Sequence, residues 1–204
     1  MIQGGVFEDL RKKSAEFVIS QPVEGVAIGG VSVGESKKEM RDQVRWVADF
    51  LPQDRPVHLL GVGQFDDIVD LVKYGIDTFD CVEPTRLARM GHLYQLEARY
   101  RVPNFNRNTP SSRLRRDWLL KKVWKQVSSL PGEIDINKTV FRNDLSAVDK
   151  DCNCYVCANF TKAYLHHLFK QKEILGYTLA TYHNLWVMER FFALLREIVS
   201  KDLI

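Results

Sequence analysis

Apolar residues along the first 82 positions follow helical and strand-like spacings in alternation. An amphipathic stretch precedes a short apolar run that ends at Gly29 and Gly30, and the same order of helix and strand then repeats twice. The predicted elements, beginning with a helix and alternating thereafter, are 7–20, 26–28, 36–51, 56–60, 65–74 and 76–82. We expect Ser36 to cap the second helix and Pro84 to end the third strand. Strands that alternate with helices predict an α/β fold with a parallel sheet.

The remainder of the chain lacks this alternation. Residues 163–175 and 182–199 have broad apolar faces at helical spacing. Four side chains of the second stretch fit either a buried core or contacts with a second copy of the chain: Trp186, Phe191, Phe192 and Leu195. We therefore divide the chain into three parts, which are residues 1–95 with the alternating elements, 96–131 as a basic insertion, and 132–204 with a cysteine cluster and the last helices.

The carboxyl ends of the predicted strands carry candidate chemistry. In parallel α/β folds the loops at these ends open onto one shared face, so functional groups gather there. The three ends are marked by Gly29-Gly30-Val31, Leu60-Gly61-Val62-Gly63 and Asp80-Cys81-Val82-Glu83. The glycines either let the backbone approach a flat ligand closely or form tight turns, and the sequence favours neither reading. A single carboxylate such as Asp80 is, taken alone, more often a helix cap or a surface group than a catalyst.

Cysteine spacing predicts a metal site in the last third of the chain. Three of the four cysteines fall within six residues: Cys152, Cys154 and Cys157. Thiolates this close repel one another unless a cation neutralises them, and Cys-X-Cys spacing disfavours a local disulfide. With His183 as fourth ligand, the cluster would fill tetrahedral Zn²⁺ and leave no position for an activated water, so we expect one structural zinc ion. Spacing alone admits two other histidines as the fourth ligand: His166 and His167.

The composition is that of an ordinary globular protein. The chain has 204 residues, of which 45% are hydrophobic and 27% charged, enough for one core and a small additional subdomain. No apolar run approaches the roughly 20 residues of a membrane span, and the first residues lack the features of a secretory signal. Free thiolates at a metal site favour a reducing compartment, so we expect a cytoplasmic protein.

Several segments together resemble the tRNA-guanine transglycosylase (queuine tRNA-ribosyltransferase) family of bacterial type, whose members exchange a guanine in tRNA for a 7-deazaguanine. The matching segments follow the family order and cover most of the chain outside residues 96–131: Gln3-Gly4-Gly5, Ala27 to Glu35, Leu60 to Gly63, Phe79 to Arg89 and the cysteine cluster. The family fold is a (β/α)8 TIM barrel with an inserted zinc-binding subdomain. The resemblance therefore implies the C-terminal half of such a barrel, together with that subdomain.

By this resemblance Asp80 is the nucleophile, which attacks C1′ of the ribose, displaces guanine and forms a covalent intermediate. The implied base-binding positions are Gln3, Gly29, Gly30, Val31, Leu60 and Gly61. The implied contacts with the tRNA anticodon loop are Gly61, Val62, Gly63, Gln64, Phe65, Asp66 and Asp67, followed by Thr85, Arg86, Leu87, Ala88 and Arg89. Gln64 stands where the family often has lysine. Val33 matches the bacterial type, which favours the precursor base preQ1 over queuine.

The chain departs from the family in its length. It is too short for a whole barrel and begins just after a mid-barrel strand, so the first half, with the aspartate that the family uses as general base, is expected outside it. Half a barrel leaves open sheet edges. We therefore expect a fragment, a truncated gene model, or one piece of a split enzyme with a separate N-terminal half-barrel. The family works as a homodimer, which the resemblance implies here too.

Residues 96–131 form an insertion that is atypical of the family. Its cations are Arg99, Arg101, Arg107, Arg113, Arg115, Arg116, Lys121, Lys122 and Lys125, and its interleaved aromatic residues are Tyr100, Phe105, Trp118 and Trp124. Asp117 is the only acid between Ala98 and Ser129. Clustered cations release counterions from phosphates, so this stretch fits contact with the tRNA backbone. The alternative is a solvated helix face whose tryptophans pack on the barrel.

Three functions fit these features. The leading hypothesis is a tRNA-guanine transglycosylase in queuosine biosynthesis, favoured by Asp80 beside the glycine loops. The second is a noncatalytic RNA-binding subunit, against which the retention of Gln3, Gly30 and Asp80 argues. The third is related chemistry on DNA, whereas the intact segment from Thr85 to Arg89 favours the anticodon loop.

Overall fold

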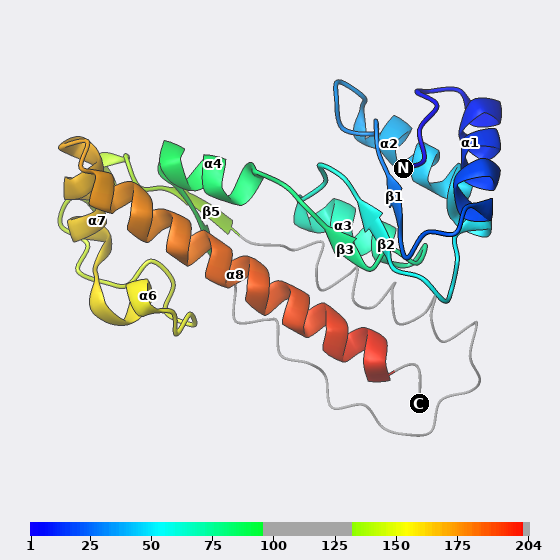
Figure 1. Ribbon diagram of the computed structural model, residues 1–204. Coiled ribbons are helices and arrows are strands. Elements are labelled where there is room, and N and C mark those ends of the chain that lie inside the picture. Colours follow the sequence, from blue (N-terminus) through cyan, green and yellow to red (C-terminus); the bar gives the residue numbers. More distant parts are fainter. Residues whose placement is uncertain (96–131, 202–204) are drawn as a thin grey trace. The chain divides into compact units, whose positions relative to one another are not determined.

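The computed structural model describes residues 1–95 and 132–201 of the chain (Figure 1). The chain divides into two compact units, Met1–Val82 and Glu83–Ile204. The basic insertion, for which we expected a contact with RNA, lies outside the described residues.

The first unit is a parallel sheet whose strands are connected by helices (Figure 1). Its strands are neighbours in the order β1 (Val26–Ile28), β2 (Val57–Leu59) and β3 (Thr78–Phe79). Its helices are α1 (Glu8–Ser20), α2 (Lys37–Val47) with the 3-10 turn η1 (Ala48–Phe50), and α3 (Phe65–Val72). Both strand pairs are parallel, with Val26 opposite Val57 and His58 opposite Thr78. The predicted alternation and the parallel sheet are confirmed.

One apolar core holds this unit together. The buried positions of the first two strands are Val26, Ile28, Val57 and Leu59, and α2 adds Met40, Val44 and Val47 at the spacing of one helical face. The predicted cap is confirmed: Ser36 Oγ accepts from Glu39 N, and the Glu39 carboxylate accepts from Ser36 N. This reciprocal pair satisfies donors that have no partner inside the helix, which fixes where α2 begins.

The residues before α1 lie along β1. Ile2 N donates to Ala27 O at 2.6 Å, and Gly29 N donates to Ile2 O at 3.0 Å. Ile2 thus forms a parallel bridge with Ile28. This bridge places Gln3 beside the carboxyl end of β1.

Two predicted boundaries near the third strand are wrong. β3 is Thr78–Phe79 instead of 76–82, because β2 offers it only His58 and Leu59 as partners. Pro84 does not merely end the strand but lies in the first turn of helix α4 (Glu83–Met90). A proline is tolerated there, since the N–H that it lacks would have no partner within the helix.

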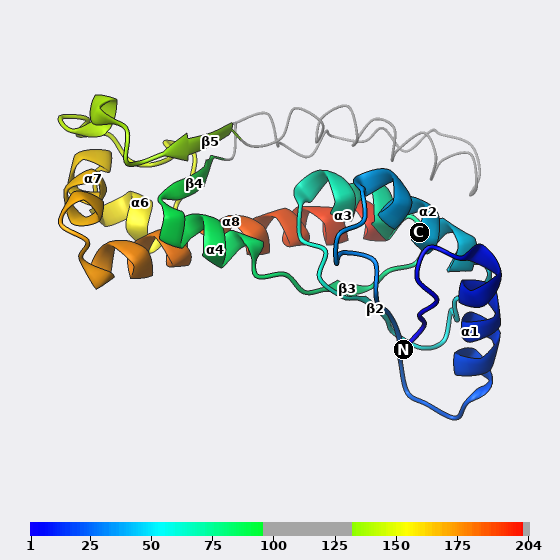
Figure 2. The same cartoon turned by 90° about the horizontal axis from the view of Figure 1, so that it is seen from above.

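The second unit is built around one long helix. Its elements after α4 are β4 (His92–Gln95), β5 (Gly132–Asp135), the 3-10 turn η2 (Thr139–Phe141), α6 (Tyr155–Asn159), α7 (Lys162–Lys170) and α8 (Ile174–Lys201). β4 and β5 pair antiparallel on either side of the insertion. Helices α4, α6 and α7 and strand β4 all pack on α8 (Figure 2). Residues 83–95, which we grouped by sequence with the preceding strands, make their contacts in this unit.

The last helices differ in extent from the prediction. The helix predicted over 163–175 ends at Lys170, and a turn with Lys172 at a φ of 57° separates it from α8. α8 then begins at Ile174, well before the predicted start at Tyr182. Phe191 and Leu195 are buried. These two side chains therefore serve the interior of the protein.

The described residues contain three consecutive parallel strands with intervening helices, and the half-barrel stays a prediction. Among these residues, no helix combines the length and the apolar character that crossing a membrane requires.

Candidate active site and metal centre

Asp80 directly follows β3, at the carboxyl end of the sheet. Its Oδ1 accepts a hydrogen bond from Gly61 N at 3.0 Å and lies 3.1 Å from His58 Nε2. The side chain is 60% exposed. Its other oxygen, Oδ2, makes no hydrogen bond within the described part of the chain. One carboxylate oxygen is thus held in place while the other is open to an approaching molecule.

His58 is a site residue that our sequence analysis missed. It is the central residue of β2, between the buried Val57 and Leu59. Its Nδ1 lies 2.8 Å from Thr78 Oγ1, so the ring contacts both Thr78 and Asp80. The signal in the sequence was a titratable residue in an otherwise apolar strand.

A buried arginine, also missed, holds the loop after β1. Arg11 is fully buried on α1. Its Nη1 donates to Gly29 O at 3.2 Å and its Nη2 to Gly30 O at 2.5 Å, while Nε donates to Gly5 O at 2.6 Å. Burial lowers the pKa of the Arg11 guanidinium, and Glu35 opposes this shift. Arg11 lies four positions before Ala15, which is also buried, so both residues belong to the inner face of the helix. A charged residue at this spacing was the available signal in the sequence.

These contacts orient the backbone of the loop. A trans peptide group points its C=O and its N–H in opposite directions. Holding Gly29 O and Gly30 O toward Arg11 therefore aims the N–H groups of Gly30 and Val31 away from it. Gly30 has a φ of 62°, in the left-handed region that favours glycine. Neither N–H donates a hydrogen bond within residues 1–95 or 132–201. The loop thus has two amide donors without a partner in this part of the chain, one in the exposed Gly30 and one in the fully buried Val31.

The other candidate base-binding positions lie along the same edge of the sheet. Leu60 N donates to Ile28 O at 3.0 Å, which places Leu60 and Gly61 beside the end of β1. Gln3 follows the bridge between Ile2 and β1, and its side chain is exposed. The structure thus brings the ends of β1, β2 and β3 together in the order that the parallel sheet predicts.

The structure shows which of the two roles considered for the glycines applies to Gly63. A Cβ atom on this residue would lie 2.2 Å from Cys81 Cβ, much closer than two carbon atoms can approach. The second glycine after β2 therefore serves the close packing of this loop on the segment after β3.

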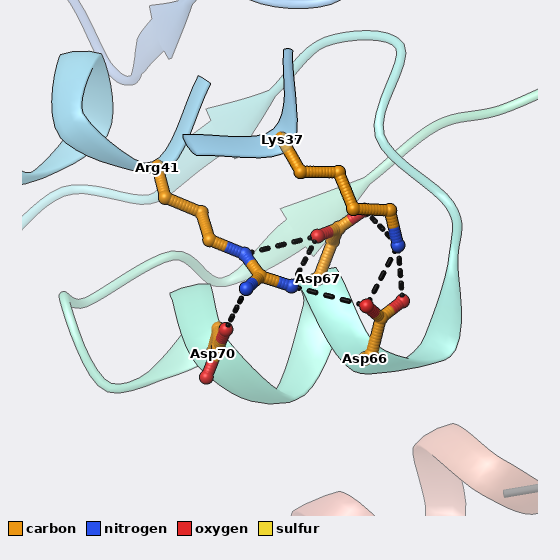
Figure 3. Close-up of polar contacts among 5 residues, drawn as sticks. All are labelled: Lys37, Arg41, Asp66, Asp67 and Asp70. Carbon is orange, nitrogen blue, oxygen red and sulfur yellow. Dashed lines mark hydrogen bonds and ion pairs between the residues drawn. The ribbon is translucent and has the colours of Figure 1, made fainter. Parts of the chain in front are cut away.

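The acidic residues at the start of α3 form ion pairs with α2 (Figure 3). Arg41 Nη2 lies 2.6 Å from Asp67 Oδ1, and Arg41 Nη1 lies 2.8 Å from Asp70 Oδ2. Lys37 Nζ lies 2.7 Å from Asp66 Oδ2. Partial burial disfavours the charged form of Asp66, but the hydrogen bond and charge of Lys37 together with the charge of Arg41 outweigh burial and hold the pKa of Asp66 below its ordinary value. The carboxylates thus fix the loop that begins at Gly61.

The second group of expected anticodon-loop contacts lies on α4. Arg86 and Arg89 are exposed on this helix, whereas Ala88 is fully buried in the core of the second unit. The two arginines therefore have side chains available to a partner, and Ala88 holds the helix in place.

The cysteine cluster and His183 come together as predicted. The four ligand atoms lie within 4.8 Å of one another. His183 Nδ1 is 3.4 Å from both Cys154 Sγ and Cys157 Sγ, and 4.0 Å from Cys152 Sγ. Tetrahedral zinc with bonds of about 2.3 Å to sulfur and about 2.0 Å to nitrogen would separate S and N by about 3.5 Å. The donor set and its spacing fit one such ion.

Of the two competing histidines, neither belongs to the cluster. His166 is buried and hydrogen-bonds through Nδ1 to Ile136 O at 2.8 Å, and His167 is exposed. His183 Nε2 lies 2.7 Å from Tyr94 O, a contact that orients the ring and leaves Nδ1 for a metal. Spacing alone could not exclude the alternatives, because it does not show which helical positions face the cysteines.

The close spacing of the four ligand atoms shifts the pKa values of the histidine and the cysteines. Burial disfavours the charged form of His183, but hydrogen bonds to Cys152 and Cys154 outweigh it and raise the pKa of His183 to about 10. Hydrogen bonds from Cys152 and Cys157 lower the pKa of Cys154, and those with Cys152 and Cys154 raise the pKa of Cys157. Without a cation the sulfur atoms must share protons. A bound metal ion would displace those protons.

Comparison with known proteins identifies the family of the chain. The family described as queuine tRNA-ribosyltransferase matches residues 1–203. Curated proteins with that name include those of Actinobacillus pleuropneumoniae, 39% identical, Histophilus somni, 40% identical, and Caldanaerobacter subterraneus, 37% identical, each over 99% of this chain. The match covers only 44 or 45% of those relatives, so the chain spans less than half of their length. The chain belongs to the queuine tRNA-ribosyltransferase family.

Proposed function

We propose that this chain is the nucleophile-bearing part of a tRNA-guanine transglycosylase, a pentosyltransferase that exchanges guanine at the tRNA wobble position for a 7-deazaguanine in queuosine biosynthesis. The observation that carries the proposal is Asp80 at the sheet edge, with Oδ1 held and Oδ2 open. The name of its relatives, queuine tRNA-ribosyltransferase, supports this activity. Since the chain spans less than half of those relatives, the activity of an assembled enzyme is part of the proposal.

The exchange proceeds in two displacements at C1′ of the ribose. Asp80 Oδ2 donates an electron pair to C1′, and the C1′–N9 bond of guanine breaks with its electrons on N9, which takes up a proton. The incoming base loses its N9 proton and attacks C1′, and the electrons of the C1′–Oδ2 bond return to the carboxylate. Two displacements restore the original stereochemistry. The general base that moves these protons is expected in the part of the relatives that this chain does not match.

The two amides after β1 that have no partner among the described residues supply the base recognition. A guanine-like base has a carbonyl oxygen at its edge, which can accept from the N–H groups of Gly30 and Val31. Gln3 adds a side-chain amide, while Gly29, Leu60 and Gly61 line the same edge. Val33 is 83% exposed in this loop. We favour preQ1 over queuine as the incoming base on the bacterial-type residue at this position.

Two segments of the chain are the proposed contacts of the anticodon loop. The target nucleotide must leave the base stack to bring C1′ to Asp80. The loop from Gly61 to Gln64 offers backbone groups and is fixed by the ion pairs of Asp66 and Asp67. The expected second contact, from Thr85 to Arg89, supplies Arg86 and Arg89, and guanidinium groups suit phosphate oxygens.

Zinc is the proposed occupant of the cysteine cluster. Cys152, Cys154, Cys157 and His183 would provide all four ligands, so the ion is structural and supplies no reactive water. It would tie α6 to α8 and to Tyr94 at the end of β4. The cysteines form no disulfide within the described part of the chain, which supports a reducing compartment such as the cytoplasm.

Two protein partners complete the proposal. Near α1 the side chains of Val6, Phe7, Leu10 and Phe17 are exposed, which fits a separate N-terminal half-barrel packing on this helix. In the second unit, Tyr155, Tyr164 and Tyr182 are exposed and belong to a chain of aromatic contacts with Phe160 and Trp186. Exposed aromatic side chains are typical of interfaces, which supports the homodimer.

A reconstitution tests the activity. The chain is incubated with tRNA and radiolabelled guanine, alone and with the N-terminal portion of the Actinobacillus pleuropneumoniae relative. We expect label to enter tRNA in the mixture, and tRNA to remain attached to the chain on a denaturing gel. Asp80→Asn should abolish both without weakening tRNA binding. An adduct that persists in Asp80→Asn contradicts the assignment, and tRNA binding without exchange in either sample indicates the noncatalytic subunit.

A further inference from the structure

We propose that His58 is a positioning residue for the Asp80 nucleophile: together with the Gly61 N–H it fixes Oδ1, so that Oδ2 faces the ribose. The inference rests on the proposed function, in which Asp80 attacks C1′. It assigns a role to a side chain that neither the sequence motifs nor the names of the relatives single out.

The register of the sheet brings the three side chains to one face. His58 lies opposite Thr78 in the parallel pair of β2 and β3. Side chains two positions apart on a strand point to the same side, so Asp80 follows Thr78 toward His58. The ring spans both residues, with Nδ1 at 2.8 Å from Thr78 Oγ1 and Nε2 at 3.1 Å from Asp80 Oδ1. His58 therefore contacts the carboxylate because of the register.

Hydrogen-bond chemistry defines the proton positions. An ionised carboxylate can only accept, so the proton of this contact lies on Nε2. In the neutral ring Nδ1 is then an acceptor, and the Thr78 hydroxyl donates to it. Thr78 thus selects the tautomer that His58 needs to donate to Asp80. The contact leaves the negative charge on the carboxylate.

Two donors on one oxygen make the two carboxylate oxygens inequivalent. With Oδ1 bonded to His58 and Gly61, rotation of the carboxylate is restrained and Oδ2 keeps its lone pairs for C1′. In the covalent intermediate Oδ1 becomes the carbonyl oxygen and can keep both donors. When the C1′–Oδ2 bond breaks, the electron pair returns to a carboxylate that these donors already stabilise. Such preorganisation acts on the chemical step, since misplacing a reacting group by about 1 Å can lower a rate about 100-fold.

The alternative role is purely structural, in which His58 only links β2 to β3 through Thr78. Three variants separate the two roles. His58→Leu removes both contacts, and His58→Gln keeps an N–H donor of similar reach toward Asp80 but loses the ring. Thr78→Val removes the hydroxyl and leaves His58 in place. Thermal unfolding of each variant identifies any loss of fold before kinetics are compared.

In the reconstituted exchange reaction, we expect His58→Leu to lower kcat about 10- to 100-fold with the KM for tRNA within about threefold, and His58→Gln to recover most of the loss. Thr78→Val should lie between wild type and His58→Leu. Wild-type kcat in a folded His58→Leu variant overturns the proposal. Equal losses in His58→Leu and His58→Gln, matched by equal losses of thermal stability, also overturn it in favour of the structural role.

A second measurement on the chain alone needs no activity. In ¹⁵N spectra at about pH 8, where imidazole is ordinarily neutral, we expect His58 to show a protonated Nε2 whose signal shifts in Asp80→Asn. An unprotonated Nε2, or a signal that Asp80→Asn leaves unchanged, overturns the inference. The expected spectra in a protein that catalyses no exchange would instead reject the proposed function while retaining the His58–Asp80 contact.

Discussion

Arg11 Nη2 donates a 2.5 Å hydrogen bond to Gly30 O, and so a buried guanidinium fixes the loop that follows β1. The same nitrogen also donates to Gln43 Oε1 at 2.6 Å, which links the loop to α2. One side chain of α1 therefore determines both the packing and the orientation of this loop.

Replacing Arg11 with methionine should destabilise the chain and weaken binding of the incoming base. Carbonyl groups of Gly5, Gly29 and Gly30 would lose a charged donor, and we expect a cost of about 2–4 kcal/mol in the free energy of unfolding. Urea unfolding and the KM for the base measure the two effects. Lys12→Met is the matched control, because among the described residues Lys12 makes only an exposed ion pair with Glu8. Equal effects of the two variants would contradict a special role for Arg11.

Removing one metal ligand should cost the chain its zinc. Cys154→Ser is expected to reduce bound zinc, measured by mass spectrometry of the metal, from one equivalent per chain to a small fraction, and to lower the thermal stability of the second unit. Cys81→Ser is the control, because Cys81 lies in the first unit, outside the cluster. Retention of a full equivalent in Cys154→Ser would show that another group binds the ion.

Zinc affinity should rise with pH. The pKa of His183 is raised to about 10 in the metal-free cluster, so a metal ion must displace its proton at every pH below that value. Competition titrations with a chelator at about pH 6, 7 and 8 should give a progressively lower Kd, with protons released on binding. A Kd that does not change over this range would contradict the protonated state of the metal-free ligands.

The ion pairs between α2 and α3 should make stability sensitive to acid. Burial disfavours the charged form of Asp66, but Lys37 and Arg41 together outweigh burial, so the pKa of Asp66 is below its unfolded value of about 3.9. The folded state therefore binds fewer protons, and the stabilisation is fully present above about pH 4 and is lost as pH falls through the folded pKa. Lys37→Met should cost about 0.5–1 kcal/mol at pH 7 and little at about pH 2.

The measurement for this pair is urea unfolding at both pH values. Lys13→Met is the control, since Lys13 is exposed and forms no ion pair among the described residues. A cost of Lys37→Met that is the same at both pH values would show that the pair does not carry the acid dependence.

Gly63→Ala should destabilise the loop after β2. Its Cβ would meet Cys81 Cβ at 2.2 Å, and relief requires a backbone shift that we expect to cost about 1–3 kcal/mol. Cys81→Gly should restore part of the loss in the double variant, because it removes the atom that clashes. In Gly132→Ala, the new Cβ would have an ordinary contact of 3.6 Å with Gln95, so this variant should be close to neutral. Thermal unfolding compares the four proteins.

Local patterns were sufficient where neighbours along the chain decide the outcome. The alternation of helices and strands, the cap at Ser36 and the three-cysteine spacing were all predicted, because each depends on residues within one or two turns. The limits of β3 and of α7 were not predicted correctly. The limits of β3 depend on the residues of β2 that pair with it, and the end of α7 depends on the turn at Lys172. The hydrophobic pattern of the sequence does not indicate where either element ends.

The sequence by itself determined the family, the parallel order of the first strands and the identity of the three thiolates. Tertiary structure alone selected His183 over His166, placed His58 against Asp80, and buried Arg11 beneath the glycine loop. These contacts join residues between 18 and 31 positions apart. Their physical basis is the register of the parallel strands and the packing of the helices. Both bring together side chains that lie far apart in the sequence, so the residues next to each side chain do not predict the contact.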